Sequence, residues 1–165
     1  MFALKTISVD AIPEALAKAE RYRLLNEPGE AESICQDVLA VDPANQQALI
    51  TLLLAMTEQF TEKIEIGKAN DVAARLQGKY ERAYYSGIIC ERQGKAQFGS
   101  GHYGAGAITH KCLMQAMRWY EQAEELRPPN NDDALLRWNT CARFLMEHPK
   151  VQPEAELPAE PILSE

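Results

Sequence analysis

The chain has 165 residues, of which 46% are hydrophobic and 25% are charged, a balance typical of one globular domain rather than of a disordered protein. Its formal net charge of -7 would repel the phosphate groups of nucleic acids and of anionic lipids. No stretch approaches the ~20 apolar residues needed to span a bilayer, and the first residues do not resemble a secretory leader. Composition therefore predicts a cytoplasmic protein that binds neither nucleic acid nor membrane.

A helical hairpin is predicted directly after an N-terminal segment, residues 1–11. Its two amphipathic helices are expected at about 12–25 and 29–41. The tetrapeptide 26–29, Asn-Glu-Pro-Gly, separates them, because proline suits the start of a helix and glycine suits a left-handed turn. The pair at 42–43, Asp-Pro, then ends the second helix.

A second hairpin is expected from Asn45 onward. Leucine, alanine and methionine recur at steps of three and four residues up to Gln59, and further apolar residues widen the band until the helix is apolar nearly all round. A weaker helix follows at about 62–77, and Gly78 ends it. The two helices are expected to pair.

A third hairpin begins near Tyr80, and its second helix ends before Pro128. Between its two halves lies a glycine-rich insertion at about 95–110, which holds four of the nine glycines of the chain. Because glycine disfavours helices, we expect a loop there.

One more helix is predicted at about 132–147, and no second helix follows it. A lone closing helix would cover the last apolar face of a stack of hairpins, so we interpret it as a cap. Residues 148–165 alternate four prolines with acidic residues and show no periodicity, which predicts a disordered tail.

Residues that decide helix packing recur in the first and third hairpins. They are large residues that fill gaps, small residues where helices cross, and a closing proline. On them the chain resembles the tetratricopeptide repeat family, with a departure in the second hairpin, where Glu65 takes the place of the usual small residue. The matching positions, within about 12–147, are Tyr22, Ala31, Val38, Asp42 and Pro43, then Gly87, Gly94, Ala116, Tyr120, Ala123 and Pro128.

The resemblance implies an all-α fold: a right-handed α-α superhelix of about three hairpins and a C-terminal capping helix. In this family the first helices of the hairpins line a concave groove that usually holds an extended peptide or a partner helix. Tyr84 and Tyr85 are the expected anchors, because aromatic side chains supply large contact area at low entropic cost. Carried over by position, the groove would present Leu16, Glu20, Arg23, Gln47, Ile50, Thr51, Leu54, Glu58, Tyr84, Tyr85, Ile88, Glu91, Arg92, Leu136, Arg137 and Thr140.

One subset of the family grips the C-terminal carboxylate of chaperones with lysine, asparagine and arginine side chains. The corresponding positions here include two glutamates, Glu20 and Glu81, and would repel a carboxylate. The chaperone-tail function is therefore excluded at the sequence level.

The stretch from Arg92 to Tyr120 contains four lysines and arginines and no acidic residue, although the whole chain is acidic. Glycines before a helix start expose N–H groups, so an anion or an acidic segment could bind there. The alternative is a connection that only lengthens a turn, which costs little closure entropy. The candidate anion site consists of Lys95, Gly99, Gly101, His102 and Lys111.

No other pattern predicts chemistry. The glycine spacing at 99–104 formally fits a dinucleotide motif, but a helix pattern precedes it instead of a strand. His110 and Cys112 point apart on a helix and lack further ligands, so we expect no metal, and we expect no cofactor. Four dispersed cysteines are expected to be reduced and buried: Cys35, Cys90, Cys112 and Cys141.

The sequence therefore predicts a non-catalytic scaffold that binds a protein or peptide partner in its groove. Two alternatives stay open. The first is an accessory module that binds a small anion or acidic ligand through the glycine-rich basic insertion. The second is a homo-oligomeric structural protein that associates through its end helices.

Overall fold

The structure is a computed structural model that describes residues 1–62 and 64–154. Its described residues form helices and no strand, which confirms the all-α prediction. None of the described helices is both long and apolar enough to cross a membrane. A short 3-10 helix, η1 (Val9–Ala11), precedes α1 (Ile12–Leu24), α2 (Pro28–Val41), α3 (Gln46–Glu58), α4 (Ile66–Ala74), α5 (Lys79–Ser100), α6 (Ala105–Leu126) and α7 (Asp133–Glu147).

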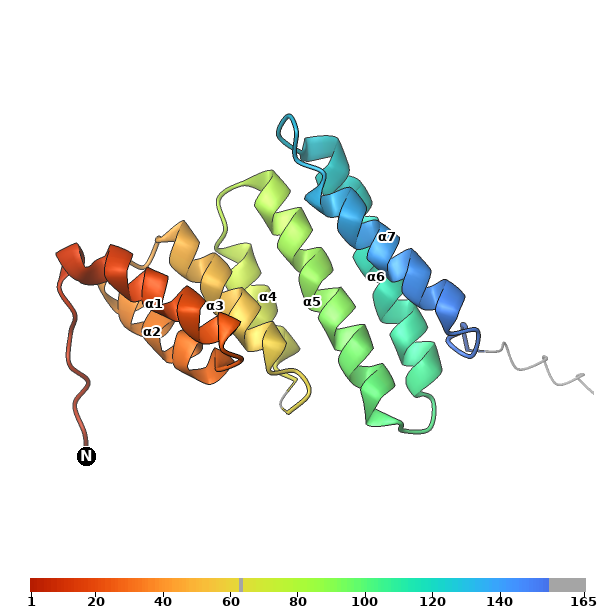
Figure 1. Cartoon of the computed structure of the whole chain (residues 1–165), viewed down its shortest axis with the longest axis horizontal. Coiled ribbons are helices and arrows are strands. Elements are labelled where there is room, and N and C mark those ends of the chain that lie inside the picture. The colour runs from red at the N-terminus through yellow and green to blue at the C-terminus, as the bar shows by residue number, and fades with distance from the viewer. Residues whose placement is uncertain (63, 155–165) are drawn as a thin grey trace, which may run out of the picture.

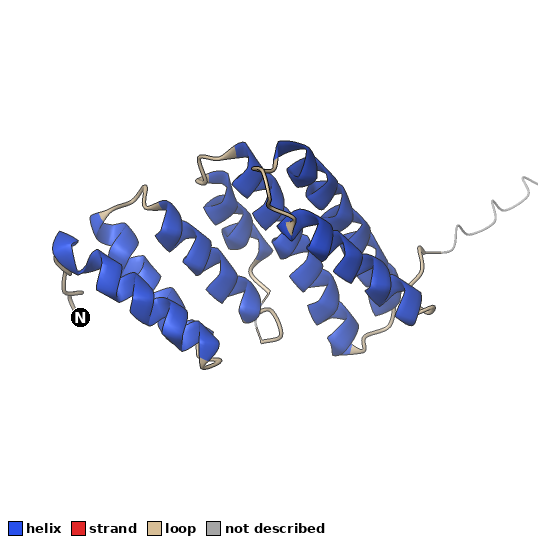
Figure 2. Ribbon diagram, turned by 45° about the horizontal axis from the view of Figure 1, so that its top comes forward, coloured by secondary structure: helices blue, strands red, loops and turns tan. Residues whose placement is uncertain are grey.

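Successive helices pack against each other as antiparallel hairpins, α1–α2, α3–α4 and α5–α6, and α7 packs on α6. Because α3 also contacts α1 and α5, the odd-numbered helices form one layer (Figure 1). The even-numbered helices lie behind that layer, and Figure 2 shows the same row of hairpins after rotation. Each hairpin thus covers an apolar face that its neighbour exposes.

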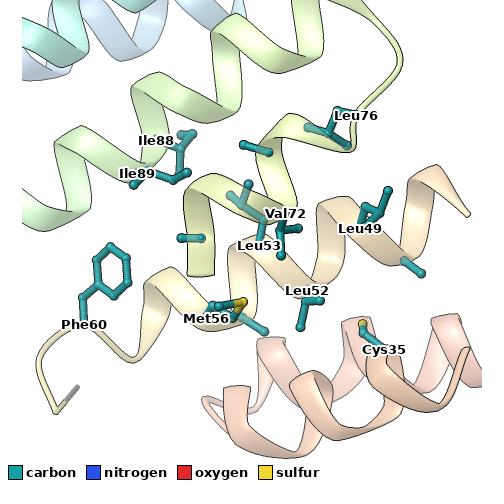
Figure 3. Packing of buried hydrophobic residues seen from close by; sticks show 14 of the residues in the cluster. Cys35, Leu49, Leu52, Leu53, Met56, Phe60, Val72, Leu76, Ile88 and Ile89 are labelled. Carbon is teal, nitrogen blue, oxygen red and sulfur yellow. The ribbon is translucent and has the colours of Figure 1, made fainter. Parts of the chain in front are cut away.

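The centre of the core is α3, whose apolar residues point to both sides. Figure 3 shows Leu52 and Met56 directed toward α2, and Leu53 directed toward Val72 of α4. Leu49 and Leu53 are fully buried. A helix with packed neighbours on two sides needs apolar residues on both, which accounts for the nearly continuous apolar band of its sequence.

A close helix crossing joins α5 to α6 through a glycine. A Cβ atom added at Gly87 would lie 2.4 Å from the ring of Tyr120, which is completely buried. At Gly94 the corresponding contact, to the Cβ of Cys112, would be 3.0 Å. Only glycine lets the two helices approach this closely, so these positions of the family resemblance do decide packing.

The weaker helix predicted at 62–77 is shorter in the structure, where α4 covers Ile66–Ala74. Glu65 precedes its first turn, so Glu65 does not occupy the crossing position assigned to it from the sequence. The fully buried small residue of this helix is Ala69. Residues with bulky apolar side chains continue to pack after the helix ends, as the buried Leu76 shows.

The prediction of a loop at 95–110 is wrong. The helix α5 continues to Ser100 and α6 starts at Ala105, so only four residues connect them. Two of the four, Gly101 and Gly104, adopt left-handed backbone angles, with φ of 65° and 80°. Contact between α5 and α6 stabilises helical turns in which glycine alone would disfavour the helix.

The first residues of the tail predicted from residue 148 pack against the helices. The N–H of Val151 donates to the carbonyl of His148 at 2.9 Å, and only 5% of Val151 is exposed. The ring of His148 stacks on Phe144 with centroids 4.2 Å apart. Burial of these apolar surfaces holds the chain against the helices beyond α7. The rest of the predicted tail, residues 155–165, lies outside the described residues.

Candidate binding surface

We call the solvent side of α1, α3, α5 and α7 the odd-helix face. A network of charged side chains crosses this face. Arg23 of α1 donates from Nη2 to Glu58 of α3 at 2.6 Å and from Nη1 to Glu20 at 3.0 Å. Arg92 of α5 lies 3.6 Å from the same Glu58 and donates to the backbone carbonyl of Leu54 at 2.9 Å. This charged network therefore connects three helices, α1, α3 and α5, along the odd-helix face.

Burial dominates the electrostatics of Arg92. It lowers the pKa of the guanidinium, and the nearby charges of Arg137 and Arg23 act in the same direction, while Glu58 opposes them. Arg23 shows the reverse result. Burial also lowers its pKa, but the hydrogen bond and charge of Glu58, together with Glu20, outweigh burial and raise it. The positive charge of Arg23 on α1 is therefore better compensated by nearby carboxylates than that of Arg92 on α5.

A second polar cluster surrounds Glu91 of α5, of which only 1% is exposed. The hydroxyl of Tyr120 donates to Oε2 at 2.6 Å, and Lys95 donates to Oε1 at 2.6 Å. Nε of Arg137 on α7 lies 3.4 Å from Oε2, but it finds no hydrogen-bond acceptor among the described residues. Burial and the Glu91 charge raise the pKa of Tyr120, so its hydroxyl keeps its proton.

Three tyrosines form an aromatic row along α5. The rings of Tyr80 and Tyr84 stack with centroids 5.8 Å apart, and Tyr85 meets the edge of Tyr84 at 5.1 Å. Burial raises the pKa of Tyr85 to about 12. Burial also raises the pKa of Tyr84, while the charges of Arg137 and Arg92 act in the opposite direction. All three tyrosines are half-buried.

Most of the predicted groove residues are accessible. Gln47 and Leu136 are exposed, and the other accessible positions are half-buried. The assignment of Thr51, Ile88 and Glu91 to the groove is wrong, because at most 2% of each residue is exposed and a partner could not reach them. Thr51 instead donates its hydroxyl to Glu20 at 2.8 Å. The remaining groove residues are Leu16, Glu20, Arg23, Gln47, Ile50, Leu54, Glu58, Tyr84, Tyr85, Arg92, Leu136, Arg137 and Thr140, and their contact with a partner stays a prediction.

The predicted loop that was to carry the candidate anion site does not form. Lys95 lies on α5 and pairs with Glu91, while Gly99, Gly101 and His102 are exposed around the end of the hairpin. Lys111 lies more than one helical turn into α6. Both helices extend into the predicted loop, so the two lysines belong to different helices, and binding of an anion there stays a prediction.

The cysteine prediction fits the structure. All four thiols are free, and three of them are buried. Burial raises the pKa of Cys35 to about 12 and that of the half-buried Cys90 to about 11, which makes both poor nucleophiles. Among the described residues no group of three or more histidine, cysteine or acidic side chains is arranged to hold a metal ion.

Sequence reasoning missed the part played by Tyr80. It precedes Tyr84 by four residues, the spacing at which helical side chains meet, and this signal could have identified the stacked pair. The ion pair between Arg23 and Glu58 joins residues 35 positions apart and had no local signal.

The geometry defines an all-helical protein of successive antiparallel hairpins with a polar and aromatic face on its odd-numbered helices. Comparison of this chain with protein-family models, with curated proteins and with solved structures gives no match.

Proposed function

We propose that the chain is a non-catalytic scaffold of the tetratricopeptide type, whose hairpins form a right-handed superhelix that holds a peptide or a partner helix against the odd-helix face. The order of helix packing supports the first half of the proposal, because the main contacts of each described hairpin are with its neighbours along the row. The close approach of Gly87 to Tyr120 supports it as well, since both belong to the positions on which the resemblance rests.

The observation that carries the second half is the aromatic row on α5. Tyr84 and Tyr85 are half-buried, and their rings are already held in place by contacts with each other and with Tyr80. Arg92 and Arg137 are half-buried as well, and their guanidinium groups can donate to backbone carbonyls or carboxylates of a partner. Side chains that are ordered before binding lose little entropy on binding, which favours a docking role.

The proposal assigns no chemistry to Glu91, although buried carboxylates often serve as acids or bases. Its two oxygens accept hydrogen bonds from Lys95 and Tyr120, and almost none of its surface reaches solvent. A substrate could not approach it without opening the contact of α5 with α6. Its geometry is that of a structural carboxylate.

The test is selection of peptides of about twelve residues from a random display library against the full chain, followed by mapping of the bound peptide through amide chemical shifts. We expect shifts on α3, α5 and α7. Tyr85→Ala and Arg137→Ala should each weaken binding about tenfold or more, as interface anchors do. Gln122→Ala changes an exposed residue of α6 and serves as the matched control, which should bind like the unmodified chain.

Circular dichroism of each variant separates loss of binding from loss of fold. Selection that yields no peptide would count against the proposal. So would peptides whose affinity is unchanged by both α5 and α7 substitutions.

A further inference from the structure

A second surface, separate from the odd-helix face, lies on α6. It is a hollow of about 540 Å³ between that helix and the chain that follows α7. Ile108 and Met114 supply apolar surface, and Lys111 and Arg118 supply positive charge. We call it the α6 hollow; its lining is Ala107, Ile108, His110, Lys111, Met114, Gln115, Arg118, Pro153 and Glu154.

The basic side chains of the hollow are not used within the described structure. Lys111 and Arg118 are exposed, and neither takes part in a hydrogen bond or ion pair among residues 1–62 and 64–154. The other basic residues of the acid-free stretch differ, because Arg92 contacts Glu58 and Lys95 contacts Glu91. The hollow therefore presents two uncompensated cations beside an apolar patch on a chain of net charge -7.

The chain after α7 is led to this hollow by a close backbone contact. A Cβ atom at Gly106 would lie 3.0 Å from the carbonyl oxygen of Lys150, so glycine at the start of α6 lets the two segments meet. Val151 is buried immediately afterwards. Pro153 and Glu154 then form one wall of the hollow. The first acidic residue after the anchor is thus already placed against the basic surface.

We propose that the α6 hollow binds the acidic C-terminal segment of this same chain, residues 155–165. The segment continues directly from Glu154 and carries three glutamates, Glu156, Glu160 and Glu165, with three large aliphatic residues between them. Its acidic and aliphatic composition matches the charge and the apolar patch of the hollow. The side chains of Lys111 and Arg118 pair with its carboxylates, and Ile108 and Met114 receive its aliphatic residues.

Length and tethering agree with this occupant. The basic stripe from residue 107 to residue 118 spans about 17 Å of helix at ~1.5 Å per residue. Eleven residues can extend over about 36 Å, so the segment can cover the whole stripe. Attachment at the edge of the hollow also supplies a local concentration on the order of millimolar, which favours this segment over a free peptide of the same sequence.

The experiment compares amide chemical shifts in the full chain with those of a free peptide of sequence 155–165. We expect Leu157, Ile162 and Leu163 to differ from the free peptide in the intact protein. The double variant Lys111→Glu with Arg118→Glu should move them to the free-peptide positions. A matched charge reversal on α1, Lys18→Glu with Arg21→Glu, changes two exposed residues and should leave them unmoved.

Two further measurements separate electrostatic docking from other causes. Adding Glu156→Lys and Glu160→Lys to the variant Lys111→Glu/Arg118→Glu should restore the docked shifts, because both partners then carry reversed charge. Raising NaCl to 1 M, where the Debye length is ~3 Å, should release the segment of the unmodified chain.

The proposal is overturned if residues 155–165 give free-peptide shifts in the unmodified chain, or if charge reversal on α6 leaves them unchanged. It is also overturned if their shifts depend on protein concentration, because the occupant would then come from a second copy. Circular dichroism of the α6 variant, whose two substitutions are on exposed side chains, verifies that the helices are retained.

Discussion

The α5–α6 and α3–α4 hairpins are stabilised in different ways. In α5–α6, two helices of 22 residues cross at Gly87, where a larger side chain would collide with Tyr120. The same pair of helices encloses a charged residue, Glu91. In α3–α4, helices of 13 and 9 residues bury aliphatic side chains, and Gly67 of α4 faces open space. A helical hairpin of this chain can therefore depend either on close approach and buried polar contacts or on aliphatic burial. The first kind should tolerate far less change.

Removal of the buried carboxylate should have the largest effect. Glu91→Ala leaves the Tyr120 hydroxyl and the Lys95 ammonium without their acceptor, and loss of one member of a buried ionic cluster costs about 3–5 kcal/mol. Urea unfolding should show this loss of stability. Glu124→Ala, an exposed position on α6, should change stability by less than about 0.5 kcal/mol. A loss below about 1 kcal/mol for Glu91→Ala would show that the cluster adds little.

Gly87→Ala should destabilise the chain by about 1–3 kcal/mol. The added methyl group would lie within 2.4–2.9 Å of the Tyr120 ring, and such overpacking outweighs the gain of about 1 kcal/mol that alanine brings to a helix. Thermal unfolding followed by circular dichroism measures the difference. An unchanged midpoint would mean that α5 and α6 separate easily, contrary to the tight crossing inferred for this hairpin.

The start of α3 offers a smaller test in the other hairpin. The side chain of Asn45 accepts a hydrogen bond from the N–H of Ala48 at 2.9 Å and donates one to Asp42 at 3.0 Å. Asn45→Ala should cost about 1 kcal/mol, as expected for an N-cap. Asn45→Ser retains an acceptor oxygen without adding a charge beside Asp42, and it should recover most of the loss in urea unfolding. Equal loss in both variants would assign the effect to the contact with Asp42 instead.

Gly67→Ala should have the smallest effect, with the opposite sign from Gly87→Ala. No atom lies within 4 Å of the position of an added Cβ, so the substitution should stabilise α4 by up to about 1 kcal/mol through helix propensity. Chemical unfolding of the two glycine variants side by side sharpens the contrast between the hairpins. A loss of stability at Gly67 would contradict the open surroundings described for α4.

Helix positions could be predicted well where local signals agree. The bounds of α1, α2, α3 and α7 lie within one residue of the ranges expected from periodicity, proline and caps. The glycine-rich region failed because glycine content was weighed without the packing of α5 on α6. Most of the predicted groove residues are accessible, but three of them proved to be buried, and contact of the others with a partner stays a prediction.

The sequence by itself determined the number and order of the helices in the described residues and their pairing as hairpins, because turns, caps and the 3.6-residue period act over a few positions. Only the tertiary structure decided which side of each helix meets solvent. Glu91 and Arg92 are neighbours on α5, and both are charged. Glu91 is enclosed by α6 and α7, whereas Arg92 reaches the charged network of the odd-helix face. Burial depends on residues that are distant in the chain, and no local pattern carries that information.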